Sequence, residues 1–250
     1  YEIRLSLVGS EMCIRDSGSY GDIATAIAEV MEKGEKPCHL GNIHTANQSG
    51  ERILSTPPWY AYLRIAEGCD NHCAYCVIPS LRGNYRSRRM EDILEEARAL
   101  AEDGVQECIV IAQDITRYGV DLYGERRLPE LLRELCRLPF HWVRLHYLYP
   151  DNLSDQLIDT IAAQPHLCKH LHLPVQCGSD RILAQMNRHY TVAQYLELIE
   201  YARRTVPGIT FSSDIIVGFP GETEEDFVKT LELVQKVGYM QLFTFIYSKR

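Results

Sequence analysis

Three cysteines separated by short gaps are the residues of this sequence best suited to metal chemistry. Cys69, Cys73 and Cys76 follow one another in a C-x3-C-x2-C spacing. A structural zinc site usually takes four ligands and a four-iron cluster usually takes four cysteines, so three thiolates are an incomplete set for either. Three ligands on an iron–sulfur cluster would leave one iron open to bind a substrate. His72 offers zinc a fourth ligand, so a zinc-binding structural module remains an alternative.

The other cysteines are scattered along the chain. The sequence contains nine cysteines, an odd number and too few for a disulfide scaffold in 250 residues. Together with the lack of a secretory leader, this count favours a reducing, cytoplasmic location. Cys108, Cys136 and Cys168 lie singly in apolar or helical stretches, where we expect small core side chains. We favour the same role for Cys38 and Cys177.

The composition is typical of a globular protein. A hydrophobic content of 46% and a charged content of 24% over 250 residues fit one large α/β domain or two small ones. No apolar run approaches the roughly 18 residues needed to span a bilayer, so we expect no membrane insertion. The net charge of -8 indicates no dominant basic face. Any contact with RNA must therefore be local or come from another part of the protein.

Short apolar runs alternate with amphipathic segments along most of the chain. Capping signals mark two of the expected helix starts, Thr191 with Gln194 and Thr223 with Asp226. The alternation predicts parallel βαβ units, as in a doubly wound open sheet or an incomplete barrel, with ligands at the carboxyl ends of the strands. The predicted strands are residues 61–66, 107–112, 142–147, 170–175, 209–218 and 241–247. The predicted helices are residues 90–103, 128–138, 154–163, 179–205 (broken near 188–190) and 223–237.

The beginning of the chain differs in character from the rest. Residues 6–17, SLVGSEMCIRDS, resemble translated adapter sequence from shotgun sequencing, so we exclude residues 1–17, including Cys13, as non-native. Residues 23–33 predict a short helix, which a polar linker follows. We therefore divide the chain into residues 1–17, a segment at 18–56 and a main domain at 57–250.

The cysteine spacing, with Tyr75 before the last cysteine, resembles the signature loop of the radical S-adenosylmethionine (SAM) superfamily. The resemblance implies that the three cysteines hold a [4Fe-4S] cluster whose fourth iron chelates S-adenosylmethionine. An electron from the cluster then releases methionine and a 5′-deoxyadenosyl radical, which abstracts hydrogen from a C–H bond. The resemblance also favours the incomplete barrel, an α/β (β/α)6 TIM-like barrel of parallel strands. A redox iron–sulfur protein that binds no S-adenosylmethionine remains an alternative.

Further segments resemble parts of the same superfamily. Residues 214–222, DIIVGFPGE, resemble the segment that supports the adenine, although a buried strand turning into a capped helix would read the same way. Gln176 ends the fourth predicted strand. Arg188 follows in the helix break, where it is predicted to meet the methionine carboxylate, the alternative being a solvated arginine. The predicted cofactor-binding residues are Tyr75, Gln113, Gln176, Arg188, Asp214, Gly218 and Glu222.

From about residue 59 onward the chain resembles the methylthiotransferases. These enzymes add a methylthio group at a C–H bond of a ribosomal protein aspartate (RimO-type) or of a tRNA adenosine (MiaB-type). Residues 112–124 and 142–150 resemble the RimO type, whereas residues 176–181 and 243–248 are also at home in the MiaB type. We favour the RimO type because the first pair follows strand ends, where substrates differ. The resemblance implies a ribosomal protein substrate, with tRNA as the alternative, and an electron donor such as a flavodoxin or ferredoxin.

Methylthiotransferases also carry parts that we do not find in this sequence. They begin with a domain whose three further cysteines hold a second [4Fe-4S] cluster, and they usually end with a small β-barrel. Residues 18–56 resemble only the end of that first domain. We therefore expect a fragment with the radical SAM core, one cluster and S-adenosylmethionine, and a second cluster in the full-length protein.

Overall fold

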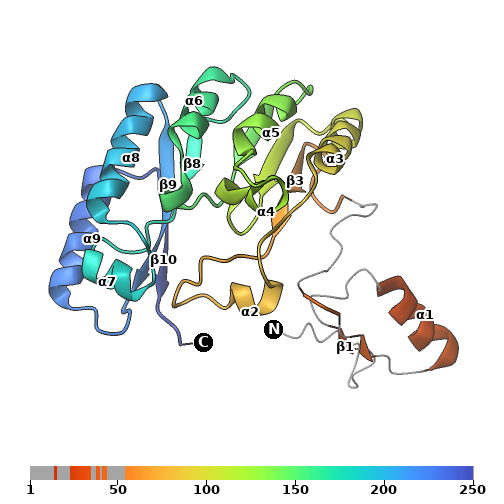
Figure 1. Cartoon of the computed structure of the whole chain (residues 1–250), viewed down its shortest axis with the longest axis horizontal. Coiled ribbons are helices and arrows are strands. Elements are labelled where there is room, and N and C mark those ends of the chain that lie inside the picture. Colours follow the sequence, from red (N-terminus) through yellow and green to blue (C-terminus); the bar gives the residue numbers. More distant parts are fainter. Residues whose placement is uncertain (1–13, 16–22, 35–37, 40, 44–53, 250) are drawn as a thin grey trace.

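The computed structural model describes residues 14–15, 23–34, 38–39, 41–43 and 54–249. Its centre consists of two parallel three-stranded sheets placed side by side (Figure 1). One has the order β3-β6-β7 and the other the order β10-β9-β8. The strands are β3 (Tyr60–Arg64), β6 (Glu107–Ile111), β7 (Trp142–Leu145), β8 (His170–His172), β9 (Thr210–Val217) and β10 (Gln241–Ile246).

The two sheets meet between β7 and β8, along a line that we call the seam. An isolated parallel bridge pairs Val143 with Leu167. The backbone N–H of Cys168 donates to the carbonyl of Val143 at 3.0 Å, and that of Leu148 donates to the carbonyl of His172 at 3.2 Å. The six strands therefore follow one another in chain order around an open, incomplete barrel. The predicted fold class is confirmed, and all six predicted strands are present, although β7 and β8 end at Leu145 and His172, short of the predicted 147 and 175.

The helices form an outer layer around these strands (Figure 1). In α5, the leucines at positions 128, 131, 132 and 135 are all buried, which is the spacing of a helix with one apolar face. Burial of this face against the strands builds the core on the outer side of the barrel. The helices of this layer are α3 (Met90–Glu102), α5 (Leu128–Leu135), α6 (Asp155–Ala163), α7 (Asp180–Gln185), α8 (Val192–Thr205) and α9 (Glu224–Val237).

The predicted break in the fourth helical segment is also confirmed. Helix α7 ends at Gln185 and α8 begins at Val192. Capping boxes start α8 at Thr191 and α9 at Thr223, as the sequence predicts. Each box satisfies backbone N–H groups that the first turn of a helix would otherwise leave unpaired.

Several short elements escaped the sequence pattern because they span less than two helical turns or only two strand residues. They follow strand ends and shape the rim of the barrel, where small changes of direction matter more than periodicity. These elements are β4 (Ala66–Glu67), α2 (Ile78–Arg82), β5 (Arg86–Ser87), α4 (Val120–Tyr123) and the 3-10 turns η2 (Ile115–Arg117) and η3 (Pro150–Asn152).

The described residues before position 54 include one helix and one small strand pair. Helix α1 (Ile23–Lys33) has the predicted bounds and buries Ala26, whereas Ile23 and Ile27 are exposed. Strands β1 (Ile14–Arg15) and β2 (Cys38–His39) pair in parallel. Cys13 and the boundary at residue 17 lie outside the described residues, so the predicted division of the chain stays a prediction.

No helix in the described part of the chain is both long and apolar enough to cross a membrane.

Candidate cofactor site

The cysteine loop begins directly after β4 and is tied down from two sides. The backbone N–H of Cys69 donates to the carbonyl of Gly83 at 3.2 Å. On the other side, the N–H of Ala74 donates to the carbonyl of Met186 at 3.0 Å, and Nδ2 of Asn187 donates to the carbonyl of His72 at 3.0 Å. The loop is thus held by the segment between α2 and β5 and by the turn between α7 and α8.

Glycine is required at the entrance to this loop. Gly68 has a φ of +81°, in the left-handed region, and a Cβ at this position would collide with the carbonyl oxygen of Asn84. The backbone between α2 and β5 therefore passes so close to Gly68 that no side chain fits there.

A buried carboxylate supports the loop from β6. Asp114 is 1% exposed and accepts hydrogen bonds from Nδ2 of Asn71 at 3.1 Å, from the N–H of Thr116 at 3.0 Å and from Nδ2 of Asn152 at 3.3 Å. Burial raises the pKa of Asp114, and the hydrogen bonds from Thr116, Asn71 and Asn152 oppose that rise. Asp114 thereby connects the loop to the ends of β6 and β7.

The three thiols share one cavity of about 440 Å³. Cys73 is buried, whereas Cys69 and Cys76 are half-buried. Burial raises the pKa of Cys69 to about 11, and the nearby Asp114, Cys73 and Cys76 raise it further against the hydrogen bond from the N–H of Asn71. A thiolate in this place needs a nearby positive charge, which a bound metal centre supplies.

Arg188 reaches the thiols from the opposite half of the barrel. It is 7% exposed; its Nη1 lies 3.6 Å from Sγ of Cys73, and its Nη2 donates to the carbonyl of Pro174 at 2.6 Å. The guanidinium also lies over the ring of Tyr149, 4.1 Å from the centroid, and its Nε donates to the hydroxyl of Tyr190 at 2.9 Å. The alternative of a solvated arginine is therefore wrong.

Five of the seven predicted cofactor residues line the same cavity as the thiols. Gln176 is buried with a φ of +75°, and its backbone bridges to β9 by accepting from the N–H of Ile216 at 2.9 Å. Oε1 of Gln113 is buried and has no hydrogen-bond partner among the described residues. The five residues are Tyr75, Gln113, Gln176, Arg188 and Asp214.

A second cavity of about 300 Å³ adjoins the first and is largely apolar. The two cavities share Tyr75, Cys76, Ile78, Gln176 and Asp214 as lining residues. The remaining walls of the second cavity come mainly from β9, β10 and the residues just after β10, and include Ile216, Phe245, Ile246 and Tyr247. Together the two cavities offer a polar end with thiols and an arginine, and an apolar end.

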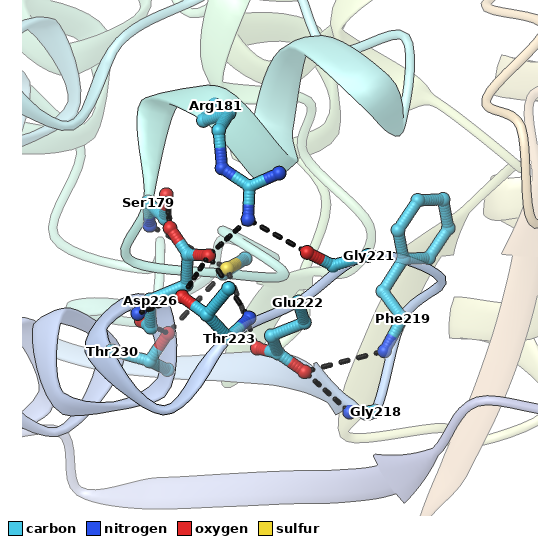
Figure 2. A network of polar contacts seen from close by, with 10 residues as sticks. Ser179, Arg181, Gly218, Phe219, Gly221, Glu222, Thr223, Asp226 and Thr230 are labelled. Carbon is cyan, nitrogen blue, oxygen red and sulfur yellow. Dashed lines mark hydrogen bonds and ion pairs between the residues drawn. The ribbon is translucent and has the colours of Figure 1, made fainter.

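The other two predicted residues, Gly218 and Glu222, line neither cavity. The carboxylate of Glu222 accepts from the backbone N–H groups of Gly218 and, at 3.2 Å, of Phe219, as Figure 2 shows. Glu222 thus closes the turn that follows β9. Whether these two residues take part in binding stays a prediction.

Asp226 joins this turn to α7 through what we call the Asp226 network. It accepts from Oγ of Ser179 at 2.6 Å, from Oγ1 of Thr223 at 2.8 Å and from Nη2 of Arg181. Arg181 also donates to the carbonyl of Gly221 at 2.7 Å (Figure 2). The network therefore fixes the β8–α7 loop, which contains Gln176, against the β9–α9 loop, which follows the strand of Asp214.

Sequence reasoning did not single out several residues that shape the site. Asp114, Tyr149 and His172 each lie in or next to a predicted strand end, where inward-facing polar and aromatic residues could have been picked out. Asn71 lies between two of the predicted ligands and carried no separate signal. The contacts that define these residues join segments more than 30 positions apart, so only the folded chain reveals them.

The chain is similar to known proteins along most of its length. Residues 63–234 match the family model described as "Radical SAM superfamily". The chain is 43% identical over 231 residues to the ribosomal protein uS12 methylthiotransferase RimO of Clostridium tetani, which is 92% of this chain and 52% of that protein. It is 46% identical over 235 residues to the RimO of Citrifermentans bemidjiense, covering 93% of this chain and 52% of that protein. The chain thus spans about half the length of these curated relatives.

Solved structures share the fold at low sequence identity. The radical S-adenosylmethionine methyltransferase TsrM of Kitasatospora setae, solved with tryptophan and a SAM analogue, has a TM-score of 0.64 and 18% identity over 78% of this chain and 39% of that one. Coproporphyrinogen III oxidase HemN of Escherichia coli has a TM-score of 0.56 and 21% identity over 78% of this chain and 46% of that one. With the family model matching well over half of its residues, the chain belongs to the radical SAM superfamily.

Proposed function

We propose that this chain is the radical core of a methylthiotransferase that modifies a ribosomal protein. The observation that carries the proposal is the cavity in which Cys69, Cys73 and Cys76 meet Arg188 and Asp214. The uS12 methylthiotransferase names of the curated relatives support the reaction and the substrate. Because the chain covers about half of those proteins, the activity of the whole protein belongs to the proposal.

The residues present fit a [4Fe-4S] cluster better than a single ion. Among the side chains that the structure describes, no three from His, Cys, Asp and Glu gather as one metal ion requires. Thiolates on three different irons stand farther apart than the ligands of one ion. His72, the proposed fourth zinc ligand, is exposed at the surface of the loop. Cys69, Cys73 and Cys76 would therefore hold three irons and leave the fourth open.

The cavities also fit S-adenosylmethionine. When bound, the cluster and S-adenosylmethionine together supply the radical that removes a hydrogen atom from an unactivated C–H bond. Arg188 provides a cation beside the thiols, and the unpartnered Oε1 of Gln113 provides a buried acceptor. Gln176 and Tyr75 wall both cavities, which limits the access of water to the reacting atoms.

The first test is reconstitution of the chain with iron and sulfide under anaerobic conditions. We expect one cluster per chain, about four irons, and an electron paramagnetic resonance spectrum that changes on addition of S-adenosylmethionine. A colourless protein with stoichiometric zinc would support the structural module instead. A cluster whose spectrum ignores S-adenosylmethionine would support a redox protein, and two clusters per chain would contradict the proposed division of the full-length protein.

The second test addresses the substrate. This chain would replace the matching 231-residue segment in the RimO of Clostridium tetani. We expect the chimera to methylthiolate ribosomal protein uS12, and a chimera with Cys73→Ala to be inactive. Modification of tRNA and not of uS12 would favour the alternative substrate.

The remaining assignments complete the proposal. We include a second cluster upstream in the full-length protein, a flavodoxin or ferredoxin as electron donor, and a cytoplasmic location. We also keep the division into residues 1–17, 18–56 and 57–250.

A further inference from the structure

A line of polar side chains crosses the inside of the barrel and ends at the cofactor cavity. Its members are Thr210, Ser212 and Asp214 of β9 and His170 and His172 of β8. Alternate residues of a strand share one face, so the three residues of β9 follow one another along the same face of the sheet. We call this line the lumen chain.

The contacts of the lumen chain are continuous. Nδ1 of His170 lies 2.8 Å from Oγ1 of Thr210, and its Nε2 lies 3.0 Å from Oγ of Ser212. Nδ1 of His172 lies 2.9 Å from the same Ser212 oxygen. Nε2 of His172 lies 3.5 Å from Oδ1 of Asp214, a polar contact longer than the other three. Each imidazole therefore uses both of its nitrogens.

Packing fixes the ring of His172 in this arrangement. His172 is 3% exposed, and the rings of His146, Tyr147 and Phe243 lie 5.5, 5.4 and 5.7 Å from it, centroid to centroid. A ring enclosed by three others cannot turn freely, so its two nitrogens keep their partners. The opposite end of the lumen chain is wetter, because His170, Thr210 and Ser212 line a separate cavity of about 430 Å³ at the amino ends of the strands.

The chemistry of the partners sets the direction of the hydrogen bonds. A carboxylate only accepts, so the proton of His172 belongs on the Nε2 that faces Asp214. With that proton on Nε2, Nδ1 of His172 accepts from the hydroxyl of Ser212, which in turn accepts from Nε2 of His170. Burial, aided by Arg144, lowers the pKa of His170 and favours its neutral form, whose Nδ1 accepts from Thr210. Every donor in the lumen chain then points toward Asp214.

Asp214 lies where the two parts of the cofactor site meet. It lines both the cavity with the thiols and Arg188 and the apolar cavity beside Ile216. The apolar cavity suits the flat base of S-adenosylmethionine, and the cation of Arg188 suits its amino-acid carboxylate. The sugar that joins the base and the amino acid of S-adenosylmethionine would thus pass Asp214. One carboxylate oxygen faces His172, which leaves the other to accept from a sugar hydroxyl.

We propose that His172 and Ser212 are positioning residues that orient Asp214 toward the sugar hydroxyls of S-adenosylmethionine. This inference rests on the proposed function, since it requires S-adenosylmethionine in the cavity. Neither histidine nor serine touches the ligand. Both act by holding one carboxylate oxygen, so that the second is already oriented when the ligand arrives.

The test is a double-mutant cycle on ligand binding, measured by calorimetry on the reconstituted chain. We expect His172→Phe, which keeps a ring but removes both nitrogens, to weaken S-adenosylmethionine binding about tenfold, the effect of losing one polar contact to a charged group. In an Asp214→Asn background the same change should weaken binding less than twofold. His172→Gln can place an amide N–H where Nε2 was, so it should restore most of the affinity.

Controls separate positioning from damage to the fold. Ser213 neighbours Ser212 on β9, but its hydroxyl donates to the carbonyl of Leu173 at 3.0 Å and accepts from the N–H of Val175 at 2.9 Å. Ser213→Ala should lower stability, and its effect should not depend on Asp214. Ser212→Ala should weaken S-adenosylmethionine binding about threefold, and in that variant the energetic coupling between His172 and Asp214 should be lost. Weakened binding of 5′-deoxyadenosine by Asp214→Asn, with methionine binding unchanged, would identify the sugar as the partner.

A spectroscopic readout needs no ligand. Nitrogen-15 NMR of the imidazoles should find the proton of His172 on Nε2, and Ser212→Ala should redistribute it. Additive effects in the cycle, or a proton on Nδ1 alone, would overturn the inference while wild-type binding keeps the proposed function intact. Failure of the wild-type chain to bind S-adenosylmethionine would overturn both.

Discussion

The guanidinium of Arg188 lies 3.6 Å from Sγ of Cys73, although the two residues are 115 positions apart. Cys73 belongs to the loop after the first barrel strand, and Arg188 to the turn between α7 and α8 on the other side of the seam. Arg188 also donates to the carbonyl of Pro174 at 2.6 Å, so one guanidinium contacts both a candidate cluster ligand and the backbone after β8. Stability and metal binding are therefore expected to depend on the same side chain.

Replacement of this arginine should lower both stability and iron content. Arg188→Met removes the donor to the carbonyl of Pro174 and leaves buried polar groups unpaired, at a cost of about 1–3 kcal/mol. Urea denaturation would measure the loss, and iron analysis after reconstitution would measure the metal. Arg137→Met is the matched control, because Arg137 is exposed and pairs with Glu134 at the surface, so it should change stability by less than about 0.5 kcal/mol. Equal effects of the two variants would contradict this account.

The three clustered cysteines should differ sharply from the isolated ones. Cys69→Ala, Cys73→Ala and Cys76→Ala should each abolish most of the bound iron, since a cluster with two protein ligands is poorly held. Cys108→Ala alters a buried cysteine of β6 outside the cavity and should retain the iron of the parent chain. Iron and sulfide analysis decides the matter, and loss of iron in Cys108→Ala alone would refute the assignment.

Because a Cβ at Gly68 would collide with backbone atoms, replacing this glycine should cost more stability than replacing another glycine with a similar φ. Gly68 and Gly104 have φ values of +81° and +88°, but a Cβ at Gly104 would meet nothing within 4 Å. Gly104→Ala should therefore cost only the strain of its backbone, about 1–2 kcal/mol. Gly68→Ala must also displace the backbone of Gly83 and Asn84 and should cost more than about 3 kcal/mol. Denaturation midpoints would compare the two variants, and similar midpoints would contradict this account.

The Asp226 network should make stability depend on pH in the acid range. Hydrogen bonds from Ser179, Arg181 and Thr223 lower the pKa of Asp226 in the folded state. As the pH falls below about 4, the carboxylate of Asp226 takes up a proton in the unfolded chain before it does so in the folded chain. The stability that Asp226 contributes is therefore complete above this pH and is lost as the pH falls further. Asp226→Asn does not titrate and should lose stability less steeply between about pH 5 and about pH 3. Urea unfolding at several pH values would measure both slopes, and parallel slopes would rule out this role.

Periodicity and local capping signals made most of the fold predictable. The break before Arg188 and the two capping boxes could be placed because each depends on residues within one or two turns. The bounds of the short elements at the rim could not, since β4 and β5 exist only as a pair and contain two residues each. Such elements depend on contacts between segments and leave no repeat in the sequence.

The candidate site was likewise predictable only where its residues are close together in the sequence. The cysteine triad could be found because its three members share one short loop. The burial of Arg188 was not predictable, because Pro174, Tyr149 and Cys73 come to it from separate strand ends. His172 was missed for a related reason: a histidine in a strand of alternating pattern gives no sign that Ser212 and Asp214 of the neighbouring strand will face it.

The seam lets a bound cofactor contribute to the stability of the fold. The cysteine loop continues from the half of the barrel that contains β3 and also bonds to the α7–α8 turn, while Gln176 and Asp214 belong to the half that contains β9. A molecule that contacts both halves links them, and its binding free energy adds to the interactions that hold the two halves together. Resistance to heat should therefore rise with the concentration of S-adenosylmethionine, and separation of the two halves must release it.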